Sequence, residues 1–207
     1  MPDLRAEFGD IDIYLFDQLL RGRLCPGMRV IDAGCGSGRN LVYLLRNGYD
    51  VRAADADPHA IATVRDLAAR LAPSLPAANF RVEAVEAMTF ADGSADVVIS
   101  SAVLHFARDA AHFDGMLEAT WRVLRPNGLF FCRLASSIGM TGMAGMAERL
   151  RPLGNGRFIL PDRSERYLVD EARLMAKTKE LGGALIDPIK TTIVQEQRCM
   201  TTWVMTK

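Results

Sequence analysis

Residues 30–40 read VIDAGCGSGRN, and this stretch decides the fold. An apolar strand ends in the acid Asp32, three glycines alternate at Gly34, Gly36 and Gly38, and a helical pattern follows. Alternating glycines let the backbone approach a ligand closely at the N-terminal end of a helix. We therefore interpret the stretch as a nucleotide-type binding loop at the carboxyl end of a strand.

The spacing of the glycines argues against a dinucleotide cofactor. The dinucleotide fingerprint is Gly-x-Gly-x-x-Gly, but its third glycine falls on Arg39 when counted from Gly34, and on Leu41 when counted from Gly36. A second acid, Asp55, ends the next expected strand. In folds of this type a carboxylate at that place accepts the hydroxyls of a ribose. Loop and acid together predict a nucleoside-bearing cofactor other than NAD.

Apolar runs of strand length alternate with helical patterns along most of the chain. This alternation predicts a doubly wound, Rossmann-like α/β sheet with helices on both faces. We expect seven strands, six of them parallel and the terminal one antiparallel at the far end of the sheet, because only a short loop separates the last two. The expected strands cover 28–33, 51–55, 79–85, 96–101, 129–134, 185–194 and 199–205, and the expected helices cover 11–21, 39–47, 59–71, 113–124 and 170–181.

Length and composition fit a single domain. The chain has 207 residues, of which 49% are hydrophobic and 24% are charged, as in ordinary globular proteins. We expect one domain over 1–207, made of a leading helix (1–24), a cofactor-binding half (25–135), an acceptor-side insertion (136–168) and a terminal helix with a strand pair (169–207). The insertion is expected to contain a small hairpin of 157–160 and 165–168.

Charge and cysteine content restrict the partners. The 25 Lys and Arg residues balance 25 Asp and Glu residues, so the sequence lacks the broad positive field of nucleic-acid binders. The four cysteines show no C-x-x-C spacing that would indicate a zinc or redox site. We find no apolar stretch of spanning length and no leader peptide in this sequence. We therefore expect a cytoplasmic protein, a monomer or homodimer, without a metal, nucleic-acid or membrane partner.

These motifs resemble those of the class I S-adenosylmethionine-dependent methyltransferases. Residues 32–38 match the pattern Asp-x-Gly-x-Gly-x-Gly, and residues 55–58 match Asp-x-x-Pro at the tip of the second strand. Residues 90–98 (FADGSADVV) and 122–128 (RVLRPNG) are similar to the segments before the fourth and fifth strands of that family.

Within the family, two short stretches resemble a small-molecule branch that includes tellurite-resistance methyltransferases. They are residues 38–40 (GRN) and 48–51 (GYDV). The resemblance thus implies that a methyl group is transferred from S-adenosyl-L-methionine to a small-molecule acceptor.

The resemblance also implies where the cofactor lies. The glycine loop would hold the methionine part with Asp32 near its ammonium group, Asp55 would bind the ribose, and residues 85–87 would flank the adenine. The residues thereby expected at the cofactor are Asp32, Gly34, Cys35, Gly36, Gly38, Asp55, Ala56, Val85, Glu86, Ala87 and Ser100.

One position departs from the family pattern. The acid at the tip of the third strand, which holds the adenine amino group, aligns with Ala84. Glu83 and Glu86 are both near enough to replace it. We expect Glu86 to do so, because positions 84 and 86 face the same side of an extended strand.

Two features concern the acceptor. His105 follows the fourth strand, at the edge of the methyl-transfer cavity in this family, and is either a general base or a residue that packs or caps. Transfer from a sulfonium is a direct displacement, so a base is needed only when the acceptor must lose a proton. Residues 138–146 contain three Gly-Met pairs spaced three residues apart, and we expect either a lid over the acceptor or a surface connection.

Three other functions stay open on the sequence. The same chemistry could act on a macromolecule, which the neutral charge disfavours. A non-catalytic cofactor-binding module would keep the glycine loop and Asp55. An NAD-dependent reductase is opposed by the glycine spacing.

Overall fold

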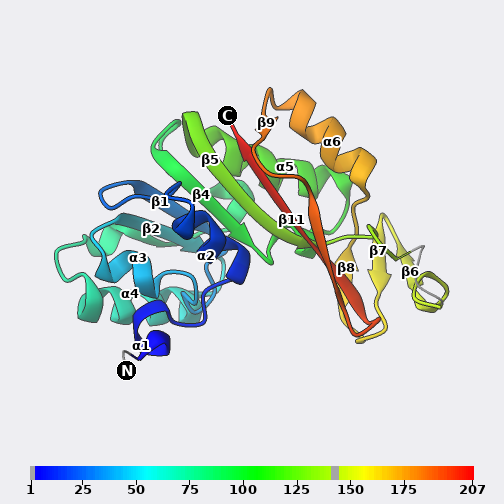
Figure 1. Ribbon diagram of the computed structural model, residues 1–207, viewed down its shortest axis with the longest axis horizontal. Helices are drawn as coiled ribbons and strands as arrows, with labels where there is room; N and C mark the ends of the chain where they lie inside the picture. The colour runs from blue at the N-terminus through cyan, green and yellow to red at the C-terminus, as the bar shows by residue number, and fades with distance from the viewer. Residues whose placement is uncertain (1–2, 141–144) are drawn as a thin grey trace.

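The computed structural model of the chain describes residues 3–140 and 145–207 (Figure 1). Its main sheet has eight strands in the order β10-β11-β5-β4-β1-β2-β3, with β9 paired to β11 beside this path. Strands β1 to β5 are parallel, and β11 runs antiparallel to β5, β9 and β10. The strands are β1 (Arg29–Ala33), β2 (Asp50–Asp55), β3 (Phe80–Val82), β4 (Ala95–Ser101), β5 (Leu124–Ala135), β9 (Ala184–Leu185), β10 (Lys190–Val194) and β11 (Arg198–Thr206).

The doubly wound parallel core is as expected, whereas the count of seven strands is wrong by one. The segment 185–194 divides into β9 and β10, with Pro188 between them, which has no N–H to donate to a sheet ladder. The antiparallel strand β11 also lies inside the sheet, between β5 and β10, instead of at its far end.

Helices cover both faces of this sheet. Figure 1 shows α3 and α4 beside β1 and β2, and α5 and α6 beside β5 and β11. The helices are α1 (Leu4–Phe8), α2 (Ile13–Leu20), α3 (Val42–Arg46), α4 (Pro58–Leu71), α5 (Ala110–Val123) and α6 (Glu171–Glu180), with single 3-10 turns at η1 (Ala77–Asn79), η2 (Val85–Ala87), η3 (Leu104–Phe106) and η4 (Ala147–Arg149). Among the described residues, no helix is both long and apolar enough to cross a bilayer.

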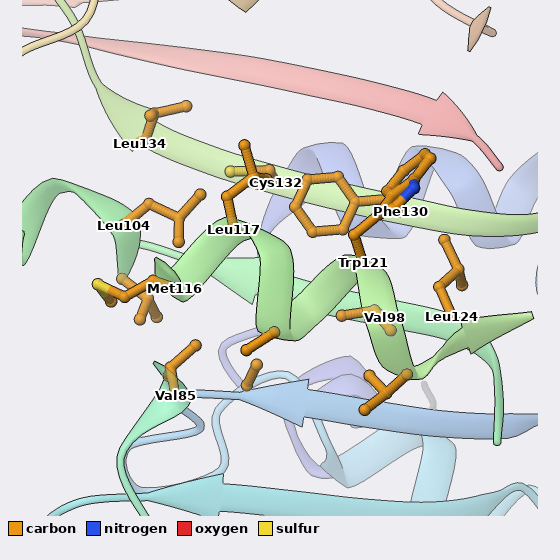
Figure 2. Packing of buried hydrophobic residues seen from close by; sticks show 14 of the residues in the cluster. Val85, Val98, Leu104, Met116, Leu117, Trp121, Leu124, Phe130, Cys132 and Leu134 are labelled. Carbon is orange, nitrogen blue, oxygen red and sulfur yellow. The ribbon is translucent and has the colours of Figure 1, made fainter. Parts of the chain in front are cut away.

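Consecutive residues of a strand pack into two separate hydrophobic cores, one on each face of the sheet. Phe130 of β5 packs in the cluster under α5 and α6, while its neighbour Phe131 packs in the cluster under α2, α3 and α4. On the α5 side, Trp121 meets Phe130 edge-on with the ring centroids 6.2 Å apart (Figure 2). Phe130 also meets Trp203 of β11 edge-on, with the centroids 5.7 Å apart. Each such fully buried side chain contributes roughly 1.5–3 kcal/mol to folding.

A second, three-stranded sheet lies beyond β5. It consists of β6 (Arg151–Gly154), β7 (Arg157–Ile159) and β8 (Glu165–Tyr167), paired antiparallel in that order. The expected hairpin is therefore confirmed as β7 and β8, and β6 was not foreseen. Figure 1 shows this small sheet standing outside the main one, near one end of β11.

The segment expected as a lid, 138–146, is only partly described, since residues 141–144 lie outside the described part of the chain. On either side of them, Met140 and Met146 are buried in a small cluster with Leu160 and Cys199. The methionines that flank the gap thus pack against the second sheet and β11.

The acid Asp96 forms hydrogen bonds that connect the beginnings of strands β1, β4 and β5. Asp96 of β4 accepts hydrogen bonds from the backbone N–H of Arg29 at 2.7 Å, from the Arg29 Nε at 3.1 Å and from the Arg125 guanidinium of β5. Its side chain is 14% exposed. These bonds, above all those from Arg29, hold the pKa of Asp96 well below its usual range.

We predict that Asp96→Asn lowers the free energy of unfolding at pH 7 by about 1–3 kcal/mol, the cost of losing charge-assisted hydrogen bonds. A depressed folded-state pKa stabilises the protein above the unfolded value near 4, and the gain disappears as the pH falls through the folded value. Urea unfolding at pH 7 and pH 3 should therefore show a smaller difference from wild type in acid. Asp92→Asn is the control, because Asp92 also meets an arginine but is 78% exposed; an equal loss there would contradict the assignment.

Candidate active site

A cavity of about 580 Å³ opens at the carboxyl ends of β1, β2 and β4. Its walls come from the loop after β1, the end of β2, the turn η2, the residues after β4 and one face of α5. Ligands of open α/β sheets bind at this kind of place, where neighbouring strands send their connections to opposite faces. Of the residues expected at a cofactor, seven line the cavity: Gly34, Cys35, Gly36, Asp55, Ala56, Val85 and Glu86.

The loop after β1 requires glycine for two different reasons. Gly34 has φ +79°, and a Cβ there would lie 2.6 Å from both methyl carbons of Val103. Gly36 has φ +51°, but a Cβ there would meet nothing within 4 Å. Gly34 thus fits tightly against the residues after β4, and Gly36 presents its backbone to open space. Gly38 does not line the cavity; a Cβ there would lie 3.0 Å from Val64 of α4.

Asp55 is fixed by the loop that it faces. Its Oδ2 accepts a hydrogen bond from the Gly36 N–H at 2.8 Å, and its Oδ1 accepts one from the Asp57 N–H at 2.9 Å. Asp57 itself accepts from the His59 N–H at 2.9 Å and caps α4. The two acids, although only two residues apart, therefore have different roles. Asp55 lines the cavity, and Asp57 caps the N-terminus of α4.

Asp32 lies beneath the loop and is 1% exposed. Its Oδ2 has no hydrogen-bond partner within the described residues. Burial raises the pKa of Asp32 to about 7; Arg39 opposes the shift and Asp55 adds to it. Since burying an unpaired carboxylate is costly, this acid is suited to a cationic ligand group.

A buried ionic network connects the N-terminal segment to the cavity wall. Asp12, which is 2% exposed, accepts from the Arg133 Nη1 at 2.8 Å and lies 3.6 Å from the Arg39 Nη2. Its N–H donates to the Asn40 Oδ1 at 3.0 Å, and Arg39 also donates to the Ser101 Oγ at 2.9 Å. Sequence reasoning missed this network, although Arg39 and Asn40 directly follow the glycine loop and both line the cavity.

The choice of Glu86 over Glu83 assumed an extended strand through position 86, and this assumption is wrong. Strand β3 ends at Val82 and the 3-10 turn η2 begins at Val85, so no extended strand runs from 84 to 86. The two glutamates nevertheless differ in their surroundings. Glu83 accepts hydrogen bonds from the N–H of Thr89 at 2.8 Å and from the hydroxyl of Thr89 at 2.6 Å, whereas Glu86 lines the cavity.

Glu86 shares the cavity wall with a histidine from α5. Its Oε1 lies 3.0 Å from the His112 Nε2, while the His112 Nδ1 accepts from the Arg108 N–H at 3.1 Å. With Nδ1 accepting, the proton of a neutral ring sits on Nε2 and is donated to Glu86. Burial opposes ionisation of Glu86, but backbone hydrogen bonding, His112 and the charge of Arg108 together lower its pKa. His112 was not foreseen because it comes from a helix distant in sequence.

Five expected residues do not line the cavity: Asp32 and Gly38, described above, and three others. Ser100 is fully buried on the α5 side of β4, and its neighbour Ser101 lines the cavity instead. Ala87, the last residue of η2, does not line it either. His105 is 3% exposed and its Nδ1 accepts from the Ala135 N–H at 2.9 Å.

The burial of His105 bears on its two expected roles, which stay predictions. Burial lowers the pKa of His105 to about 3, and the charges of Arg166 and Arg198 add to this shift. The ring is therefore neutral at physiological pH, and its Nδ1 is already occupied. This geometry gives no support to a general base at position 105 and corresponds to the packing alternative.

Comparison with known proteins finds a similar domain over about half of the chain. Residues 31–132 match a protein family described as a methyltransferase domain. An uncharacterised methyltransferase of Synechocystis sp. is 32% identical over 107 residues, which are 52% of this chain and 47% of that protein. A ubiquinone biosynthesis O-methyltransferase of Chelativorans sp. is 28% identical over 171 residues, 79% of this chain and 64% of that protein. The stretch from β1 to β5 is thus similar to a methyltransferase domain.

A solved structure agrees with the fold. The 1,6-didemethyltoxoflavin-N1-methyltransferase of Burkholderia thailandensis, with bound S-adenosylhomocysteine, has a TM-score of 0.69 at 18% identity and covers 99% of this chain and 81% of its own. The chain spans less than two thirds of the length of the two curated relatives above. S-adenosylmethionine is the cofactor of the family, and the unpartnered oxygen of Asp32 and the open space at Gly36 fit such a cation-bearing ligand.

We predict that binding of S-adenosylhomocysteine weakens as the pH falls through 7. In the free protein Asp32 gains a proton below its raised pKa, and a neutral carboxyl cannot balance the ammonium group of the ligand. For one group with a pKa of about 7, calorimetry should give a Kd about tenfold higher at pH 6 than at pH 8. Asp32→Asn should bind more weakly and lose this pH dependence; a wild-type Kd equal at both values would refute the role.

We also predict that Glu86→Ala weakens cofactor binding more than Glu86→Gln, which keeps one acceptor oxygen beside His112. The expected losses are about tenfold for Ala and a few-fold for Gln, within the range for a partly exposed hydrogen bond. Glu83→Gln is the matched control, since Glu83 bonds only Thr89 among the described residues. If Glu83→Gln alone weakened binding, the assignment of the adenine end would move to position 83.

Proposed function

We propose that the chain transfers the methyl group of S-adenosylmethionine to a small-molecule acceptor. One observation carries the proposal: a buried carboxylate oxygen of Asp32, which has no hydrogen-bond partner among the residues that the structure describes, lies beneath a glycine loop that opens onto a cavity of about 580 Å³. A volume of several hundred Å³ is typical of small-molecule sites. Metabolite-sized ligands therefore suit it better than a macromolecular surface does.

The cofactor assignment follows from unused bonding capacity. Asp32 would pair with the ammonium group of the methionine part. Each oxygen of Asp55 accepts one backbone N–H and keeps a further lone pair, so the carboxylate can accept both ribose hydroxyls without leaving the loop. Val85 and Glu86, which line the cavity from η2, would flank the adenine.

The chemistry asks the chain mainly for positioning. When bound, S-adenosylmethionine supplies an activated methyl group on a sulfonium. The chain orients the two reactants and keeps water away, which supports a direct displacement. Apolar wall residues, among them Val103, Phe106 and Met116, serve this exclusion. Because His105 is buried and occupied, we propose no protein base at that position.

The acceptor class is inferred from charge and relatives. The formal net charge of zero disfavours nucleic acid, and one relative is named for ubiquinone biosynthesis, that is, for a small molecule. Placement in the tellurite-resistance-like branch rests on residues 38–40 and 48–51 and stays a prediction. The cytoplasmic location and the monomeric or homodimeric state stay predictions as well.

The first test is binding. Calorimetry should show saturable binding of S-adenosylmethionine and S-adenosylhomocysteine and none of NAD. Asp55→Ala should cost about 2–3 kcal/mol of cofactor affinity, because it removes charge-assisted hydrogen bonds. Asp57→Ala should leave the affinity unchanged while removing about 1 kcal/mol of stability as a lost helix cap. NAD binding without S-adenosylmethionine binding would end the proposal.

The second test separates enzyme from binding module. The protein is incubated with S-adenosylmethionine labelled in its methyl group and a bacterial extract, which is then split into small-molecule and macromolecular fractions. Label in the small-molecule fraction that depends on Asp55 supports the proposal. Label in protein or nucleic acid alone would favour a macromolecular acceptor, and binding without any transfer would favour a non-catalytic module.

A further inference from the structure

The cavity rim carries an aromatic ring that is unusually open. Phe106, the last residue of η3, lines the cavity and is 58% exposed. The guanidinium of Arg166, from β8 of the second sheet, lies over this ring with its Cζ 4.7 Å from the centroid. Arg166 does not itself line the cavity, but its contact with Phe106 places its guanidinium next to a residue that does.

Strand β8 is held firmly enough to place Arg166 there. The next residue, Tyr167, is 6% exposed and stacks on Phe113 of α5 with the centroids 5.3 Å apart. Because successive strand residues point to opposite sides, anchoring Tyr167 against α5 fixes the side on which Arg166 emerges. The position of Arg166 over Phe106 is therefore set by the packing of its neighbour.

The charge of Arg166 is not balanced by any acid. Within the described residues its side chain makes one hydrogen bond, from Nη1 to the carbonyl oxygen of Glu165 at 2.7 Å, and no carboxylate lies within 4.0 Å. Asp162 is the acid whose charge acts on Arg166, but its carboxylate already accepts hydrogen bonds from Arg198 at 2.8 Å and from the Ser164 hydroxyl. Four of the five N–H donors of Arg166 remain for a ligand.

The acids at the cavity are already engaged. Glu86 pairs with His112, and Asp55 bonds the loop amides. Burial lowers the pKa of Arg166; Asp162 opposes this, and repulsion from Arg198 adds to it. A cation in such surroundings is stabilised when an anion arrives, because no carboxylate of the described residues lies within 4.0 Å of it.

We propose, building on the function proposed above, that Phe106 and Arg166 recognise the acceptor and select a planar aromatic molecule that carries an anionic group such as a carboxylate. An aromatic plane can pack against the exposed part of the Phe106 ring that Arg166 does not cover. The planar fork of Arg166 matches a carboxylate with two parallel hydrogen bonds. A neutral acceptor of the same shape could pack against the Phe106 ring but would leave the charge of Arg166 unpaired.

The experiment compares two probes of equal shape, 2-naphthoate and its neutral amide, 2-naphthamide. Their binding is measured by ligand-observed NMR titration with and without saturating S-adenosylhomocysteine. We expect wild type to bind the acid at least tenfold more tightly than the amide. Arg166→Gln should reduce binding of the acid about tenfold and leave the amide within twofold, while Phe106→Ala should weaken both.

Arg163→Gln is the matched control. It removes the same charge from the connection between β7 and β8, where Arg163 is exposed and its side chain makes no polar contact within the described residues. It should leave both probes unchanged. Arg166→Lys, which keeps charge without the planar fork, should fall between wild type and Arg166→Gln and shows that a loss is not simply misfolding.

Each contrary result is decisive. Equal affinity for acid and amide, equal losses in Arg163→Gln and Arg166→Gln, or no binding of either probe in the millimolar range would overturn the inference. Binding of S-adenosylhomocysteine is recorded on the same samples. Its absence would count against the proposed function, whereas its presence without a preference for the acid would overturn only the acceptor assignment.

Discussion

The site depends on the change of direction at strand β1. The chain after β1 passes to α3 on one face of the sheet, and the chain after the neighbouring strand β4 passes to α5 on the other. Nothing in the connections covers the gap between these two strand ends. The approach of Gly34 to Val103 sets how close the ends come, so both the glycine loop and the cavity are consequences of this one crossing.

Buried acids serve opposite purposes on the two sides of this crossing. Asp12 and Asp96 accept hydrogen bonds from arginines and backbone donors, and these bonds stabilise the fold. Asp32 has an unpartnered oxygen and a pKa raised to about 7 by burial. A raised pKa means that the folded state disfavours the ionised form, so the free protein loses stability as the pH rises from about 4 through 7. A cationic ligand that pairs with Asp32 would offset this loss of stability, so cofactor binding and the stability of the protein are coupled.

The sequence was sufficient for those parts of the site that the backbone dictates. The glycine loop, Asp32 and Asp55 sit at strand ends whose place is fixed by the βαβ alternation, and the structure places the loop and Asp55 at the cavity. Side-chain direction was harder: Ser100 and Ser101 differ by one residue, and only the register of β4 decides which reaches the cavity. His112 and Arg166 depend on how α5 and β8 pack across long stretches of chain, which no local pattern encodes.

The internal position of β11 has a consequence for the order of assembly. Strand β10 pairs with β11, and β11 pairs with β5, so β10 has no partner in the main sheet until the residues after it have been added. During synthesis on the ribosome, the β5 edge stays open over about 60 residues of further chain, and an open edge is a template for unwanted pairing between molecules. Completion of the sheet is thus a late, long-range event, and shielding by a chaperone would be most useful before β11 emerges.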